Sequence, residues 1–403
     1  MNDEATGVSE STAPVPAIED ESSSLATRHS PLATQIPTRR DEIEAKQRQV
    51  ATLMAECGAE GLLLFDPPNL AWFTGAAFCH GIADPNEWPA IYLTPDQRWL
   101  LSSSADTQRI FDVYLDGLGF QLKEWPWHWG REQLLADLVQ NRKMACDRVL
   151  ANSLPLGPAF RRIRLTLTPP EQGRLQSLGA AVAHALEATG RHAEPGQTEE
   201  EVAGEVAHRL LKHGVVPATL HVAGDGRSRR HRRPSITPSR IERSCVITVT
   251  GQQNGLHATA ARTFHFEPPD AGQRGDHAAA CQIVAALAAT ARPRMLLADV
   301  LEAGRGVAQL SDREPEWFRG PTGHVTGWLP IEREITPTLT YHFEADWSVV
   351  WQAGVGTAVV ADTWLVRDPP VCVTKPESWP AQRIKVGGAT IDVPDILVRS
   401  GMP

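Results

Sequence analysis

The residues best suited to chemistry lie around His231, just ahead of a predicted β-hairpin. Four arginines flank this histidine in the run 229–233. Neighbouring positive charges disfavour protonation of an imidazole, so His231 is predicted to stay neutral and to act as a general base. The arginines would also suit a carboxylate or an oxyanion, which favours an acidic substrate. The alternative interpretation is a solvated basic loop without a chemical role.

The hairpin that follows His231 is predicted to have one polar face. Its strands are expected at 245–250 and 256–266, because β-branched and apolar residues there are bounded by Gly and Asn. Side chains alternate along a strand, so Thr259 shares a face with His257 and Ala261. Leu256, Ala258 and Ala260 then form the apolar face.

This layout resembles the creatinase, prolidase and aminopeptidase P family. In that family a histidine precedes the first metal-binding aspartate by 17 residues, a second aspartate follows 11 residues later, and Arg-Thr-Phe comes next. The matching positions here are His231, Thr248, Thr259 and the segment 262–264, which begins with Arg262. The spacing is kept, whereas hydroxyls stand where the family has carboxylates.

The resemblance also implies a set of metal-ligand positions. In the family, two aspartates, one histidine and two glutamates hold two metal ions that activate water. The resemblance assigns these positions to Thr248, Thr259, His324, Glu344 and Ala361. Hydroxyls and a methyl group are poor ligands for divalent cations, so no metal and no other cofactor is predicted.

The resemblance further implies the fold. Residues 64–75, with an expected turn at 66–69, resemble the start of the N-terminal domain of creatinase-like proteins. Helices and strands on either side of the hairpin follow a pseudo-repeated order that resembles the two halves of the pita-bread fold. We therefore expect an α/β N-terminal domain, creatinase N-terminal-like and ribonuclease H-like, and an α+β pita-bread C-terminal domain.

Composition and turn signals divide the chain into four parts. The first is a predicted disordered tail at 1–38, rich in Ser, Thr, Pro, Ala and Glu. The creatinase-like N-terminal domain is predicted at 39–165, because helical and strand patterns alternate there. The pita-bread domain at 170–370 begins at a Pro-Pro pair, and a C-terminal extension at 371–403 is expected to be extended chain.

Bulk composition narrows the class of protein. The 403 residues are 42% hydrophobic, enough for a sizeable core, and the formal charge is −9. No basic stripe follows a predicted helix, so neither nucleic acid nor membrane is an expected partner. Six scattered cysteines without a Cys-x-x-Cys pattern favour the reducing cytoplasm.

The function predicted from these patterns is metal-independent hydrolysis of an amide-like C–N bond in a small molecule, with a histidine as general acid/base. Creatinase offers the precedent, because it cleaves a C–N bond without metal. The predicted catalytic residues are His231, His324 and Glu344. The predicted substrate-binding residues are His257, Thr248, Thr259, Arg262 and Glu332.

Two alternatives stay open. The first is a catalytically inactive pita-bread protein used as a binding module, like the degenerate domain of a eukaryotic histone chaperone. The second is a metal-dependent Xaa-Pro aminopeptidase, which would need ligands that this chain lacks. In each case a homodimer is expected, because family active sites are completed by a second subunit and the tryptophan-rich stretch 125–129 would otherwise expose an apolar patch.

Overall fold

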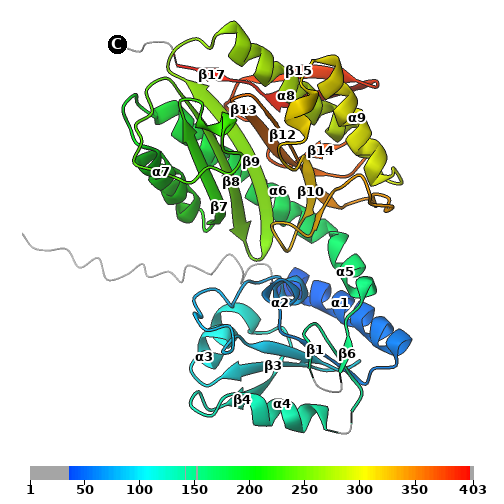
Figure 1. The fold of residues 1–403 in the computed structure, drawn as a ribbon. Helices are drawn as coiled ribbons and strands as arrows, with labels where there is room; N and C mark the ends of the chain where they lie inside the picture. The colour runs from blue at the N-terminus through cyan, green and yellow to red at the C-terminus, as the bar shows by residue number, and fades with distance from the viewer. Residues whose placement is uncertain (1–35, 141, 151–152, 400–403) are drawn as a thin grey trace, which may run out of the picture.

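The computed structural model describes residues 36–140, 142–150 and 153–399. Most of the predicted tail, residues 1–35, lies outside this range, whereas residues 36–38 belong to the first helix. Two domains are stacked along the molecule, and a short helix, α5 (Pro158–Leu165), joins them (Figure 1). The expected combination of an α/β N-terminal domain with a pita-bread C-terminal domain is confirmed.

The N-terminal domain is built on a six-stranded mixed sheet in the order β4-β3-β2-β1-β5-β6. The central strand β1 is antiparallel to β2 and parallel to β5. The strands are β1 (Gly61–Leu64), β2 (Ala90–Leu93), β3 (Arg98–Ser103), β4 (Gln121–Trp125), β5 (Met144–Cys146) and β6 (Ser153–Pro155). The helical elements are α1 (Ile36–Cys57), α2 (Pro67–Thr74), α3 (Thr107–Ile110), the π-helical turn η2 (Phe111–Leu115) and α4 (Glu132–Val139).

The segment expected to be a turn after β1 is instead the start of α2. Asp66 is the extended residue ahead of this helix, and Pro67 occupies its first turn, where a missing backbone N–H costs nothing. Gly75 ends the helix in the left-handed conformation, with φ at 69°, and its N–H donates to Ala71 O. The turn was predicted from prolines that also suit a helix start.

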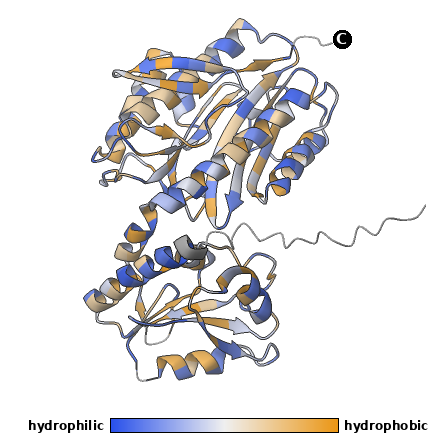
Figure 2. Cartoon of the chain, turned by 180° about the vertical axis from the view of Figure 1, so that it is seen from behind, coloured by the Kyte–Doolittle hydropathy of each residue, from blue (hydrophilic) through white to orange (hydrophobic). Residues whose placement is uncertain are grey.

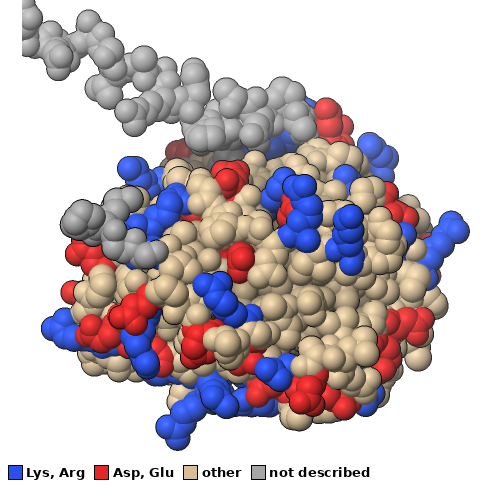
Figure 3. Space-filling view, turned by 90° about the horizontal axis from the view of Figure 1, so that it is seen from above, with Lys and Arg blue, Asp and Glu red and all other residues tan. Residues whose placement is uncertain are grey.

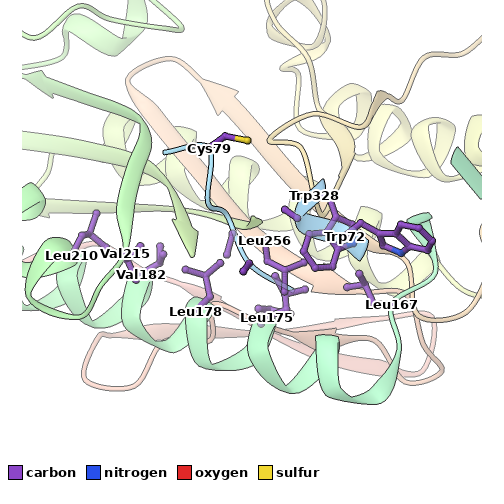
Figure 4. Close-up of a cluster of buried hydrophobic side chains, with 14 of the residues drawn as sticks. Trp72, Cys79, Leu167, Leu175, Leu178, Val182, Leu210, Val215, Leu256 and Trp328 are labelled. Atoms are coloured by element: carbon purple, nitrogen blue, oxygen red, sulfur yellow. The ribbon is translucent and has the colours of Figure 1, made fainter. Parts of the chain in front are cut away.

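The pita-bread domain begins with two helices behind its first sheet, α6 (Pro169–His192) and α7 (Glu199–Lys212). Seen from behind, α6 runs diagonally across the domain (Figure 2). Its buried stripe includes Leu175, Leu178 and Val182, at the helical spacing expected from the sequence. These side chains point toward the interior that also holds Leu256 and Trp328 (Figure 4).

Two main sheets, a two-stranded ribbon and further helices make up the rest of this domain. One sheet has the order β17-β9-β8-β7, and the other has the order β11-β10-β12-β13-β14. The strands of the first are β7 (Val216–Gly224), β8 (Ser244–Gln253), β9 (Leu256–His265) and β17 (Leu397–Val398). Those of the second are β10 (Gly323–Thr326), β11 (Arg333–Glu334), β12 (Ser348–Val355), β13 (Ala358–Leu365) and β14 (Val371–Cys372). The remaining helical elements are η3 (Arg227–Arg229), α8 (Ala271–Thr290), α9 (Leu297–Leu310) and α10 (Glu314–Trp317).

The predicted hairpin is formed by β8 and β9. Only two residues turn the chain, because Asn254 and Gly255 both adopt positive φ values, 51° and 90°, as a tight hairpin turn requires. Leu256, Ala258 and Ala260 lie in the main hydrophobic cluster, so the predicted apolar face is confirmed.

The C-terminal segment is extended, as predicted. It forms the ribbon β15 (Ala381–Val386) and β16 (Ala389–Pro394), which turns at 387–388, and then adds β17 to β9 in parallel. Acidic and basic side chains are interspersed on the face that Figure 3 shows. Among the described residues, none of the helices combines the length and the apolar character needed to cross a membrane.

Candidate active site

Residues of both pita-bread sheets line a cavity of about 360 Å³. The first sheet contributes three strands, β7, β8 and β9, and the second contributes β10, β12 and β13. Short loops, α10 and Ile283 of α8 complete the lining. The polar lining residues used below are Thr219, His221, Arg232, Arg233, Thr248, Thr250, Thr259, Glu316, His324 and Gln352.

The first sheet presents two rows of side chains to this cavity. Strand pairing aligns Thr219 with Thr250 and Thr250 with Thr259, so three hydroxyl groups share one row. The hydroxyls of Thr250 and Thr259 are 2.8 Å apart and hydrogen-bonded. The second row aligns His221 with Thr248. Of the polar hairpin face predicted from the sequence, Thr259 lines the cavity, whereas His257 and Ala261 are not among the lining residues.

The second sheet contributes His324 and Gln352. His324 on β10 pairs with Val350 on β12, two residues from Gln352, so both side chains lie on the same face of the sheet. Gln352 in turn pairs with Ala361 on β13. The Gln352 side-chain amide donates to Pro321 O at 2.9 Å, which leaves its carbonyl oxygen for other partners.

Glu344 does not line the cavity. Its half-buried carboxylate accepts hydrogen bonds from Arg162, with Nε at 2.8 Å. Gln352, which sequence reasoning missed, stands instead with Thr248, Thr259 and His324. Side chains alternate along β12, and Gln352 pairs with Ala361 on β13. These two features would have identified Gln352. The motif Phe343-Glu344 instead predicted a residue that lies before β12.

His324 is a buried and neutral imidazole. Its residue exposure is 7%, and its buried Nε2 atom has no hydrogen-bond partner within the described part of the chain. Burial, and to a lesser extent the charge of Arg233, lowers the pKa of His324 to about 4, although the Pro330 carbonyl acts in the opposite direction. At pH 7 the cavity therefore holds a neutral histidine with a free ring nitrogen.

His221 is a second imidazole in the same cavity, and sequence reasoning missed it because β7 was not predicted as a strand. Its Nδ1 atom lies 3.0 Å from Pro234 O. Since a carbonyl can only accept, Nδ1 must carry a proton, and in the neutral ring Nε2 then holds the lone pair. This hydrogen bond fixes the tautomer that a general base needs.

His231 lies outside the cavity lining, on the exposed surface of the loop after η3. Its backbone N–H donates to Arg227 O at 3.1 Å, which continues the local turn. Of the neighbouring arginines, Arg232 and Arg233 line the cavity. The structure therefore separates His231 from Thr248, Thr259 and His324, although the 17-residue spacing to Thr248 is kept.

Comparison with known proteins identifies the family that this architecture resembles. Residues 173–365 match the metallopeptidase family M24. The pita-bread domain belongs to this family. No curated protein is similar enough in sequence to count as a relative.

Several solved structures share the fold over most of the chain. The prolidase from Pyrococcus horikoshii OT3 superposes with a TM-score of 0.72 at 15% identity, covering 83% of this chain and 99% of its own. The X-Pro aminopeptidase from Thermotoga maritima gives 0.70 at 14% identity, covering 82% and 97%. The N-terminal domain of the FACT complex subunit SPT16 from Cicer arietinum gives 0.59 at 12% identity, covering 86% and 97%. At these identities the likeness concerns the fold alone.

Arg262 supports the M24 fold from within the core rather than facing the cavity. Its wholly buried guanidinium lies 3.0 Å from Asp362 and 3.5 Å from Glu187, and it also donates to Ala261 O and Thr374 O. This network ties α6 to β9 and β13. Arg262 is thus held away from the substrate-binding role that the sequence analysis considered.

His257 and Glu332 also lie outside the cavity lining. The Nδ1 atom of His257 is 3.1 Å from Gly327 O, and burial lowers the pKa of His257 to about 4. The Glu332 carboxylate pairs with Arg164, which also donates to Asn69 Oδ1 at 2.8 Å. Glu332 therefore takes part in an ionic contact between the two domains.

The residues at the M24 metal-ligand positions do not fit a two-metal centre. Thr248, Thr259 and His324 offer two hydroxyls and an imidazole, and Ala361 offers a methyl group. Glu344, the fifth residue assigned by the resemblance, is paired with Arg162 outside the cavity lining, and Gln352, which does line the cavity, offers a carboxamide. Within the described ranges, no group of three or more His, Cys, Asp or Glu side chains could hold a metal ion. Divalent cations of this type need several anionic or imidazole donors together.

Proposed function

We propose that this protein is a metal-independent member of the M24 family that hydrolyses an amide-like C–N bond of a small molecule in the cavity. His324 is the leading acid/base, and His221 is the second candidate. The single observation that carries this proposal is a neutral, buried imidazole with an unpartnered Nε2 in a cavity lined by threonine hydroxyls.

The proposed reaction uses only groups that the cavity contains. A neutral imidazole accepts a proton from water while the water oxygen attacks the amide carbon. Threonine hydroxyls donate to the carbonyl oxygen as it gains negative charge. When the C–N bond breaks, the imidazolium returns its proton to the leaving nitrogen, so that an acid and an amine are released.

Metal independence is supported by the donor set. Two hydroxyls and a methyl group stand at three of the five assigned positions, and Glu344 is paired with Arg162 outside the cavity lining, which leaves His324 as the one strong donor among them in the cavity. We expect the purified protein to hold far less than one equivalent of Mn, Fe, Co or Zn by elemental analysis. A stoichiometric metal content would instead favour the metal-dependent Xaa-Pro peptidase.

A binding module without turnover is the second candidate function. The observation that favours it is that, among the described residues, no carboxylate is hydrogen-bonded to His324 or to His221, so neither imidazolium would be stabilised by such an anion. The fold shared with the N-terminal domain of SPT16, a subunit of the FACT complex, is compatible with such a role.

The homodimer and the cytoplasmic location are also proposals. Trp127 and Trp129 are 67% and 75% exposed, so each offers a large apolar surface to a second subunit. All six cysteines are free thiols, which suits a reducing compartment.

Substitution of the two histidines distinguishes the candidate functions. The protein is assayed by release of amine from a panel of small N-acyl amides. With a substrate in hand, His324→Ala should lower turnover by about 10²-fold or more, because general acid/base catalysis contributes about 10² to 10⁴. His231→Ala is the matched control and should stay within about threefold. The opposite ranking would restore His231 as the acid/base, and absence of turnover with intact ligand binding would favour the binding module.

A further inference from the structure

The loop between β10 and β11, residues 327–332, touches both the candidate active site and the N-terminal domain. Pro330 and Ile331 line the cavity that holds the candidate acid/base. Leu329 instead lines a separate cavity of about 280 Å³ together with Asn69 of α2. The same short loop therefore faces the active-site cavity on one side and the N-terminal domain on the other.

A buried cation of the linker helix holds the end of this loop. The Glu332 carboxylate is paired with Arg164 of α5, and both side chains are buried. Arg164 also donates from Nη1 to Asn69 Oδ1 at 2.8 Å. The second carboxylate oxygen of Glu332 accepts the Leu329 N–H at 3.2 Å, and the Glu332 N–H donates to Val325 O at 2.8 Å. One arginine thus anchors the end of the loop and, through the carboxylate, its middle.

A second cation holds the start of the loop. Trp328 is 2% exposed, and Lys46 Nζ of α1 lies 5.4 Å from the centroid of its ring, a cation–π contact. Lys46 is itself fixed by ion pairs of 2.7 Å with Glu42 and with Glu171. The loop is therefore held at both ends by cations of α1 and α5, and Pro330 lies between the two anchors.

The part of the loop between the anchors lies against His324. Pro330 lines the cavity together with His324, and its carbonyl favours the protonated form of the imidazole, so it lies close to the ring. The Thr326 hydroxyl, at the end of the strand that carries His324, donates to Leu329 O at 3.3 Å. Since protein interiors are close-packed, a shift of this loop changes the packing around His324.

We propose that Arg164 is a positioning residue for His324, which it holds through Glu332 and the loop 327–332. The inference rests on the proposed function, in which His324 is the acid/base, and it adds a role for the docked N-terminal domain in shaping the active site. Arg164 lies outside the cavity lining, so its effect on the chemistry must pass through the loop. Supporting contacts of this kind keep an acid/base within a fraction of an ångström of its productive position.

Chemical modification of His324 tests the coupling without a substrate. Diethylpyrocarbonate acylates accessible neutral imidazoles, and the exposed His231 is the internal reference, read by mass spectrometry. Arg164→Met combined with Glu332→Gln removes both charges, so no buried ion is left unpaired and the fold is retained. We expect modification of His324 relative to His231 to accelerate at least about tenfold, with faster hydrogen exchange at the Leu329 amide, because the loop opens more often. Unchanged reactivity of His324 would overturn the proposal, whether or not the loop exchanges faster.

Arg162→Met is the matched control. Arg162 lies on the same helix and also bridges to the pita-bread domain, but its partner Glu344 lies outside the cavity lining and the pair is largely exposed. Loss of such an exposed pair should leave both the reactivity of His324 and the exchange of the loop unchanged. Equal effects of Arg162→Met and of the double variant would refute a specific role for Arg164.

Kinetics separate this inference from the proposed function. With a hydrolysable amide, the double variant at 164 and 332 should lower kcat by about tenfold or more and change KM by less than about threefold, because the loop positions the acid/base rather than the substrate. A loss that falls on KM alone would contradict the positioning role. If the unmodified protein hydrolyses no amide, the proposed function fails, whereas faster modification of His324 in the double variant still supports the coupling.

Discussion

Rebuilding the metal site is the sharpest test of how the cavity relates to the M24 centre. Thr248→Asp, Thr259→Asp and Gln352→Glu together would surround His324 with three carboxylates. If Gln352 occupies the fourth ligand position, this triple variant should bind Mn²⁺ or Zn²⁺, whereas the unmodified protein should not.

The register of β8 and β9 determines how strongly carboxylates at positions 248 and 259 would repel each other. Thr248 pairs with Ala261 and Thr259 with Thr250, so positions 248 and 259 are diagonal neighbours, roughly 7 Å apart. At an effective dielectric constant of about 20, two carboxylates at that separation repel each other by about 2 kcal/mol. Desolvation adds to this cost, so the metal-free variant should melt at least about 5 °C below the unmodified protein.

Thermal unfolding with and without metal measures both effects. A metal present at about 1,000 times its Kd stabilises the folded state by about 4 kcal/mol, which would reverse the deficit of the triple variant. The double variant Thr248→Asp/Thr259→Asp keeps Gln352 and the native Glu344, and it is the matched control. If the double variant gains as much from metal as the triple variant, Gln352 does not contribute a ligand and our assignment fails. If the unmodified protein is itself stabilised by metal, metal independence fails.

Three further predictions concern stability and assembly. Arg262→Ala should lower the free energy of unfolding by about 3–5 kcal/mol in urea, because Asp362 and Glu187 would stay buried without their cation. Acid should destabilise the fold as pH falls from about 6.5 toward 4, because His257 and His324 have folded-state pKa values of about 4 and the unfolded chain takes up protons first. The loss in the free energy of unfolding is up to about 3 kcal/mol for each histidine. His257→Gln should therefore make the stability less dependent on pH. Trp127→Ser with Trp129→Ser should shift light-scattering mass from dimer to monomer.

Matched controls separate these effects from general damage. Arg383→Ala removes an exposed ion pair with Asp392, so it should cost about 1 kcal/mol or less in the same urea experiment. Phe318→Ser removes an aromatic ring that is 70% exposed on the pita-bread domain, and it should leave the dimer intact. A cost for Arg383→Ala as large as that for Arg262→Ala would refute the buried-charge argument, and a monomer with Phe318→Ser would refute the assignment of the interface to the tryptophans.

The sequence predicted those parts of the site that depend on local pattern. The family resemblance assigned Thr248, Thr259 and His324 to one site, and all three line the same cavity, His324 from the second sheet. The pairing of β12 with β13 is not local, so a residue before the strand, Glu344, was preferred to Gln352. Chain spacing likewise could not tell on which side of its loop His231 lies. Loop direction depends on packing that no short sequence motif records.

The charge pattern inside the protein gives the strongest argument about what the cavity can bind. Six aspartates and glutamates are buried in the described part of the chain, and each has an arginine or lysine partner; they are Glu42, Glu171, Glu187, Glu199, Glu332 and Asp362. A buried carboxylate without a cation would be costly, and a bound metal is one way to supply that cation. With hydroxyls and amides at the ligand positions, the cavity no longer needs a metal for charge balance.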